Sequence, residues 1–211
     1  MRKWIAVAAL SCLTAACLTQ ENRHAFYLEP DGSATWTVTE EEVRSDADES
    51  AEREREEREY LDAAQRGDQR VARALRGLGA SWVETRVVRE ERPFTVVTEA
   101  RFASAARMLE EFLVQLGLEA EATLDVGLCR TRLVFRFSEK AGESDEGAEV
   151  EALLEPAEGY RFVLTEGRFV ESRGFRLERD ETVAVMLDPD EQEYEGETAV
   201  YELTWELSSE R

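Results

Sequence analysis

The alternation of apolar and polar residues at a spacing of two constrains the fold of this chain more than any other sequence feature. In the segment A-T-W-T-V-T, Ala34, Trp36 and Val38 alternate with threonines. This period places one set of side chains on one face of a β-strand and the other set on the opposite face. Runs of this kind predict strands at 24–29, 33–42, 81–90, 94–102, 124–128 and 132–137, with further short strands between 160 and 207.

Two regions follow a helical period instead. Apolar residues from Ala105 to Leu116 recur three or four positions apart after Ser104, which predicts an amphipathic helix with a serine N-cap. A charged helix is expected at 47–66, with burial beginning at Tyr60, and a short helix capped by Asp68 should follow it. The chain is therefore expected to be α+β, with a mostly antiparallel β-sheet, two or three helices packed on it and a β-rich C-terminal part.

The same periodicity predicts which side chains are buried. Leu133, Phe135 and Phe137 share one face of a strand and are expected to pack against the helix at 105–116. Cys129 is expected to be a buried thiol that behaves as a small hydrophobe, and His24 a residue of a strand face. Five aromatic residues at alternating strand positions are expected in the core, with a ligand-binding groove as the alternative: Tyr27, Trp36, Trp82, Tyr201 and Trp205.

Acidic residues dominate the charge of the chain. There are 47 aspartates and glutamates against 26 lysines and arginines, which gives a formal net charge of −21. Nucleic acids are excluded as partners, because their phosphates require clustered basic side chains. No apolar run in the sequence reaches the ~18–20 residues of a membrane-spanning helix.

The N-terminus reads M-R-K-W-I-A-V-A-A-L-S-C-L-T-A-A-C. A short basic region precedes an apolar segment from Trp4 to Leu13, and small residues lead to Cys17, which is the layout of an export signal. The end of this segment resembles the lipobox of bacterial lipoproteins. That resemblance implies cleavage before Cys17, diacylglycerol modification of its thiol and a membrane anchor made of acyl chains.

The resemblance also implies a division of the chain. Residues 1–16 would be the signal peptide, 17–23 a lipidated tether and 24–211 a single α+β domain, with a β-rich subdomain at 150–211 as the alternative. Three other readings of the N-terminus stay open: ordinary signal-peptidase cleavage after the Thr-Ala-Ala stretch, an uncleaved anchor, and a lipobox ending at Cys12. Leu18 in place of an aspartate after the cysteine favours the outer membrane over the inner one.

Chemical motifs predict no catalytic, cofactor-binding or metal-binding residue and no cofactor. The acidic segment 188–197 fails the EF-hand spacing, because Glu193 occupies the place where glycine is required. Glycine-rich phosphate loops and a G-x-S-x-G elbow are absent from the sequence.

The predicted function is that of a lipid-anchored cell-envelope protein with a non-catalytic binding or scaffolding domain. The alternatives are an apolar-ligand-binding lipoprotein and a carboxylate-dependent hydrolase. Cleavage before Cys17 would leave 24 of the 26 bases and all 47 acids, a net charge of −23, so the expected partner is a basic envelope protein. The charged helix at Asp46–Arg66 is expected to be solvated surface, with a docking face for this partner as the alternative, and the oligomeric state stays open.

Overall fold

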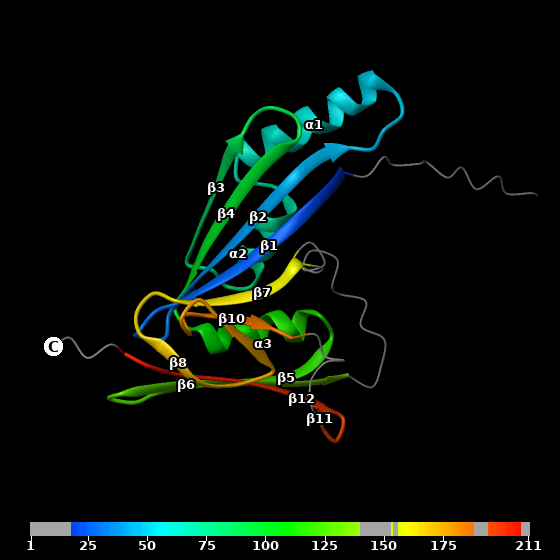
Figure 1. The fold of residues 1–211 in the computed structure, drawn as a ribbon. Helices are drawn as coiled ribbons and strands as arrows, with labels where there is room; N and C mark the ends of the chain where they lie inside the picture. Colours follow the sequence, from blue (N-terminus) through cyan, green and yellow to red (C-terminus); the bar gives the residue numbers. More distant parts are fainter. Residues whose placement is uncertain (1–17, 140–152, 154–155, 188–193, 208–211) are drawn as a thin grey trace, which may run out of the picture.

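The computed structural model describes residues 18–139, 153, 156–187 and 194–207 (Figure 1). The signal segment and Cys17 therefore lie outside the described residues, as does most of the acidic segment 188–197. In chain order the elements are β1 (Leu18–Leu28), β2 (Ala34–Ser45), α1 (Ser50–Gln65), α2 (Arg70–Gly77), β3 (Trp82–Arg89), β4 (Phe94–Phe102), α3 (Ala105–Gln115), β5 (Leu118–Val126), β6 (Arg130–Glu139), β7 (Pro156–Leu164), β8 (Arg168–Arg173), β9 (Phe175–Glu178), β10 (Val183–Met186), β11 (Tyr194–Glu195) and β12 (Thr198–Glu206).

The strands form two sheets, which confirms the predicted α+β class. Sheet A has seven strands in the order β3-β4-β2-β1-β7-β10-β9, and sheet B has the path β11-β12-β6-β5 with β8 paired to β12. The β1–β7 pair is parallel, and the other strand pairs among the described residues are antiparallel. Strands that follow residue 156 belong to both sheets, so the C-terminal third is divided between them and does not form one β-unit.

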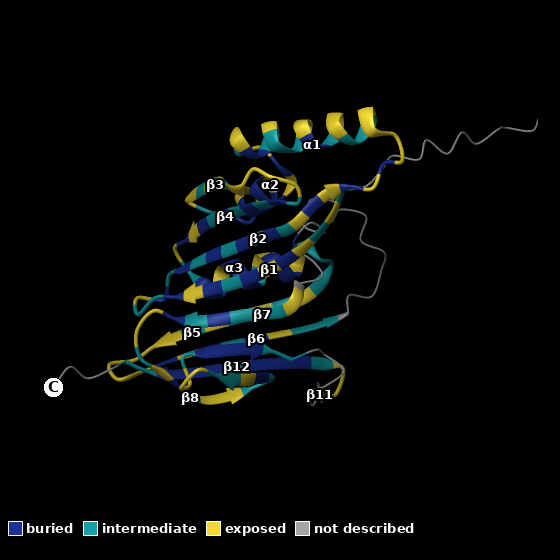
Figure 2. Ribbon diagram, turned by 45° about the horizontal axis from the view of Figure 1, so that its top comes forward, coloured by how far each residue is buried: buried dark blue, intermediate teal, exposed yellow. Residues whose placement is uncertain are grey.

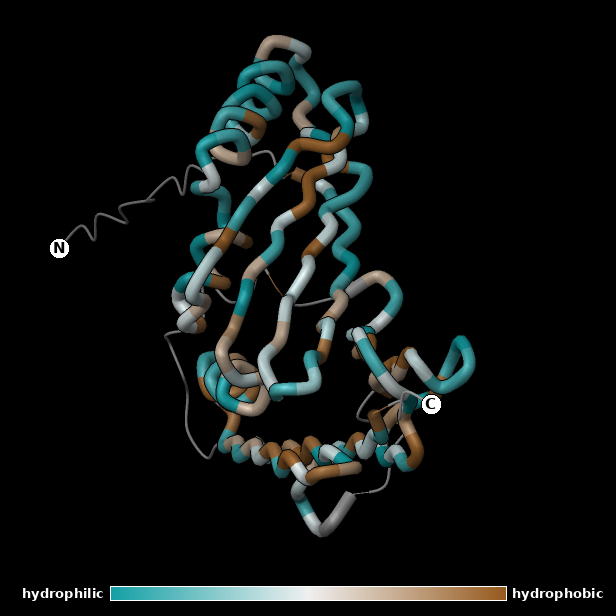
Figure 3. The backbone as a smooth tube through the Cα atoms, turned by 90° about the vertical axis from the view of Figure 1, so that its left-hand side faces the viewer, coloured by the Kyte–Doolittle hydropathy of each residue, from teal (hydrophilic) through white to brown (hydrophobic). Residues whose placement is uncertain are grey.

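One face of sheet A is covered along its whole length. Helices α1 and α2 lie over one end of this face, and α3 and sheet B lie over the other (Figures 1 and 2). The covered face carries the buried residues of β2 and β4 that the alternation predicts, from Ala34 to Val38 and from Phe94 to Phe102. In Figure 3, α1 is almost entirely hydrophilic, whereas hydrophilic and hydrophobic residues alternate along the strands.

Aromatic rings join the two sheets into one core. Trp36 is fully buried and packs against Phe112 of α3, with the ring centroids 5.1 Å apart. Phe162 of β7 contacts Phe26 in sheet A and Phe135 in sheet B. A single hydrophobic core therefore extends from α3 and sheet A into sheet B.

The predicted inward face of β6 is confirmed, because Leu133 and Phe135 are buried. The ring contacts of Phe135 differ from the expected ones. They are made with Phe162 and Phe175 of sheet A and with Tyr201 of β12, whose ring is stacked at 5.0 Å. Helix α3 contacts β6 but packs mainly against β5.

Several boundaries differ from the predictions. Residues 18–23, expected as a tether, are the first part of β1, because they pair with the end of β2 from Leu18↔Ser45 onward. The N-cap of α2 is Gln69 and not Asp68. The strand expected at 124–128 begins at Leu118 and ends at Val126, and Leu128 is fully exposed in the turn that follows.

Candidate functional site

Polar side chains interrupt the apolar inward face of sheet A below α1 and α2. Asn22 and His24 on β1, Glu40 on β2 and Thr98 on β4 are all buried. The strand register makes them neighbours, because Asn22 pairs with Glu40, and His24 and Thr98 both pair with Val38. Tyr60 of α1 and Gln69 at the start of α2 reach the same face. We call these six residues the buried polar patch: Asn22, His24, Glu40, Tyr60, Gln69 and Thr98.

His24 is held neutral inside the protein. Its Nδ1 accepts a hydrogen bond from Nε1 of Trp36 at 3.1 Å, and its ring lies edge-on to Tyr160 at 5.2 Å. Burial lowers the pKa of His24 to about 4, because the charged imidazolium would lose its hydration. Since Nδ1 accepts, Nε2 carries the proton of the neutral ring, and this donor has no partner among the described residues.

Glu40 is shifted in the opposite direction. Burial raises the pKa of its carboxyl group to about 7, while the side chains of Tyr60 and Gln20 lower the pKa to a smaller extent. The pKa of Tyr60 is raised by its own burial and by the neighbouring Glu40. Neither Oε2 of Glu40 nor the Tyr60 hydroxyl forms a hydrogen bond of good geometry within the described residues. The Glu40 carboxyl group therefore becomes mostly protonated as pH falls below about 7, and the Tyr60 phenol stays neutral.

Gln69 completes the patch from α2. Its amide nitrogen donates to the hydroxyl oxygens of Thr85 and Thr98, at 2.9 and 2.8 Å. Its Oε1 is buried without a partner among the described residues. Buried side-chain atoms of His24 and Gln69 therefore lie without a hydrogen-bond partner among the described residues, close to the Glu40–Tyr60 pair.

Polar contacts hold α1 over this patch. Glu57 is buried, forms an ion pair with Arg92 and accepts a hydrogen bond from the backbone N–H of Ser45. The Ser45 hydroxyl donates to Glu56. Sequence reasoning missed Glu57, because it lies in a charged run in which burial was expected to begin only at Tyr60. The one signal in the sequence is that Glu57 lies seven residues before the buried Ala64, a spacing that places both on the same face of the helix.

The patch is sealed in this structure. His24 is 1% exposed and Glu40 is 2% exposed, so neither group meets a molecule from solvent. An acid and a base with shifted pKa values are typical of functional sites, but proton-transfer catalysis also requires contact with a substrate. The shifted pKa values of His24 and Glu40 instead link the stability of the domain to pH.

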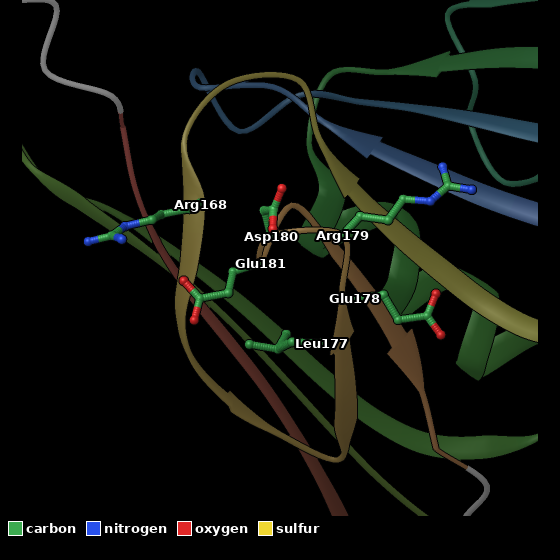
Figure 4. Close-up of a pocket in the computed structure, with 6 residues that line it drawn as sticks. All are labelled: Arg168, Leu177, Glu178, Arg179, Asp180 and Glu181. Carbon is green, nitrogen blue, oxygen red and sulfur yellow. The ribbon is translucent and has the colours of Figure 1, made fainter.

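A surface cavity of about 480 Å³ lies where β8, β9 and the β9–β10 turn meet (Figure 4). Its lining is mostly charged and includes Arg168, Glu178 and Arg179. Figure 4 shows the two arginines extending to opposite sides, so they do not form a common anion site. Glu178 is occupied by ion pairs with Arg161 and Arg176, which lower its pKa. This cavity is a shallow polar surface rather than an apolar ligand pocket.

The remaining candidates from the sequence are dispersed. Cys129 is exposed in the β5–β6 turn, so the expected burial of its thiol is wrong. The expectation rested on the general tendency of a free cysteine to be buried, which does not hold for this exposed turn. Trp36, Tyr201 and Trp205 are core residues, as predicted, whereas Tyr27 and Trp82 are partly exposed and do not join them in a groove.

The described residues contain no cluster of three or more histidine, cysteine, aspartate or glutamate side chains arranged to hold a metal ion. No helix in the described part of the chain is long and apolar enough to cross a membrane.

Comparison with known proteins finds few similarities. No protein-family model matches the chain, and no curated protein matches it. Among solved structures, the chain is similar to the folded domain of the LppM protein of Mycobacterium tuberculosis, determined by NMR. The two share 10% sequence identity, with 90% of this chain and 91% of the other covered and a TM-score of 0.38. A TM-score of this size does not assign a common fold.

Proposed function

We propose that the chain is a bacterial lipoprotein, anchored through Cys17, whose domain is a binding or scaffolding module of the cell envelope without catalytic activity. The observation that carries the anchor is the N-terminal order of basic, apolar and small residues ending in Cys17. The absence of an aspartate after Cys17 favours the outer membrane, facing the periplasm.

The fold adds a consequence for this anchor. Because β1 begins at Leu18, a lipid on Cys17 would adjoin sheet A without a spacer. The end of β2 at Ser45 pairs with Leu18 and would lie at the same distance from the membrane. Repulsion between an acidic domain and anionic lipid headgroups would then favour an upright orientation, with sheet B away from the bilayer.

The binding role is supported by the distribution of polar groups. His24 and Glu40, whose pKa values are strongly shifted, are both buried. The described surface instead presents cross-strand ion pairs such as Arg132–Glu202 and a β5 edge with which no described strand pairs, both of which suit recognition of a partner.

Fractionation of cells tests the proposal. Wild-type protein should be found in the membrane fraction and should resist extraction with high salt, because acyl chains and not charges hold it. The Cys17→Ser variant should be released as soluble protein or accumulate as the uncleaved precursor. The Cys12→Ser variant is the matched control and should behave as wild type. Membrane retention of mature Cys17→Ser would contradict the proposal.

A further inference from the structure

Strand β5 is a long and regular edge of sheet B. It pairs with β6 over nine residues without a register shift, and no described strand pairs with its other side. The edge strand β3 contains a register shift at Val87–Arg89 and contacts α1 and α2, while the edge strand β9 has four residues. Proteins usually protect such edges with bulges, short strands or a covering helix. Strand β5 has neither of the first two protections, because it is nine residues long and pairs with β6 without a bulge.

The two faces of β5 differ in character. Leu118, Ala120, Ala122 and Leu124 are half-buried and belong to the face that packs on α3. On α3, Val114 is 48% exposed. A strand added next to β5 would therefore gain contacts by placing small or medium apolar side chains on this face.

The outward face of sheet B carries charges that alternate in sign from strand to strand. Arginines of β6 lie between acids of β12 on one side and acids of β5 on the other. Arg132 forms a two-pronged contact with Glu202 at 2.6 and 2.7 Å, and Arg130 pairs with Glu206 at 2.7 Å. On β5, Glu121 lies opposite Arg136, and Asp125 lies opposite Arg132.

This alternation ends at β5. The β5 acids Glu121 and Asp125 lie opposite arginines of β6, and Glu119 lies opposite Ser138. No described strand pairs with the other side of β5. The acids of β12, in contrast, also face β8, where Arg173 pairs with Glu202 in register. A strand with basic outward side chains would continue the same pattern.

We propose that the edge of β5 binds an extended segment of a partner protein by β-strand addition, the segment having basic side chains on its outward face and apolar side chains on its inward face. The main-chain hydrogen bonds would supply affinity, and the alternating side chains would supply selectivity. This inference rests on the proposed binding role of the domain and names the class of its partner.

A second copy of the chain does not fit this edge. Pairing of β5 with another β5 would place the acidic row of Glu119, Glu121 and Asp125 against itself, and like charges directly opposite each other destabilise a strand pair. The occupant is therefore a different, basic segment.

The probe is a synthetic nine-residue peptide in which lysine and valine alternate. It is added to the full mature chain in a non-ionic detergent, and binding is followed by fluorescence anisotropy and by amide hydrogen exchange. We expect binding that weakens as salt rises to ~0.15 M, together with slower exchange of those β5 amides that point away from β6. A peptide of the same composition with its lysines in one block should bind at least about tenfold more weakly, because its two faces are not distinct.

Two variants with equal changes in charge separate edge binding from general attraction. Replacing Glu119→Gln, Glu121→Gln and Asp125→Asn should weaken binding of the alternating peptide roughly tenfold, since cross-strand charge pairs each contribute a few tenths of a kcal/mol or more. Replacing three exposed acids of α1, Glu54→Gln, Glu59→Gln and Asp62→Asn, should weaken it by no more than about twofold.

The outcomes that overturn the inference are distinct from those that overturn the anchor. Equal weakening by both triple variants, protection of amides in α1 or β3 instead of β5, or no binding of the alternating peptide would each refute strand addition at β5. Membrane fractionation of Cys17→Ser is independent of all three results.

Discussion

At the scale of single residues, the buried polar patch contains two opposite pKa shifts. The unfolded chain would titrate His24 near 6.5 and Glu40 near 4.5, whereas the folded protein has values of about 4 and about 7. Folding thus releases a proton from His24 and takes up a proton at Glu40 between pH 4.5 and 6.5. The His24 contribution to stability is lost as pH falls through this range, and the Glu40 contribution is lost as pH rises.

The contribution of each group to the free energy of unfolding changes by at most about 1.4 kcal/mol per pH unit. Because the two contributions change in opposite directions, they should nearly cancel between pH 4.5 and 6.5. Relative to wild type, the free energy of unfolding of Glu40→Gln should increase with pH in this range, and that of His24→Gln should decrease. Urea denaturation at several pH values measures both. The two tyrosines facing these groups, Tyr60 and Tyr160, have raised pKa values and stay neutral throughout. Parallel pH profiles for all three proteins would contradict this prediction.

A close backbone approach at Gly167 gives a second prediction at this scale. Gly167 has a φ of 92°, and a Cβ atom there would overlap the backbone carbonyl oxygen of Glu206 at the end of β12. Gly79 has a φ of 83° but open space around it. Gly79→Ala should cost about 1–2 kcal/mol from backbone strain alone, and Gly167→Ala should cost clearly more. Equal melting temperatures for the two variants would show that β7–β8 does not approach β12 as described.

At the scale of elements, the register of β6 decides which of its side chains are in the core. Phe135→Ala should reduce the free energy of unfolding by about 3–5 kcal/mol, because Phe135 is 2% exposed and packs among Phe162, Phe175 and Tyr201. Arg132→Ala removes an exposed ion pair with Glu202 and should cost about 1 kcal/mol or less. Comparable losses in denaturant unfolding would mean that the register is shifted by one residue.

Helices and strands whose apolar residues recur at regular spacing along their whole length were predictable from the sequence. The strand at Phe94–Phe102 and the helix begun by Ser104, whose hydroxyl accepts from the Arg107 backbone N–H, are as expected. The start of β5 was missed, because Ala120 and Ala122 give a weak apolar signal between glutamates. The pairing of β1 with β7 is parallel and joins residues more than 130 positions apart, which no local pattern encodes.

The buried polar patch was not predictable for a similar reason. His24 was correctly placed on a strand face, but its acceptor role toward Trp36 depends on the pairing of two strands. Glu40 continues the alternation of β2 as a polar residue at an inward position, and one sequence does not reveal which charged residues are buried. Tyr60 and Gln69 reach the patch from helices whose packing is set by tertiary contacts.

At the scale of the whole molecule, the proposed lipid anchor at Cys17 and the edge of β5 lie in different parts of the fold. A lipid on Cys17 would fix the chain beside Leu18, at one end of sheet A, and would leave the edge of β5 in sheet B open to a basic segment. We expect a membrane-bound module that presents a strand edge and paired charges, with His24 and Glu40 buried in its interior.

Intact-mass analysis of the protein purified from membranes is the most direct test of lipidation at Cys17. We expect a chain that lacks residues 1–16, begins at Cys17 and carries the added mass of a diacylglycerol group, with or without a further acyl chain. An unmodified chain, or a mature chain that begins at any other residue, would contradict it.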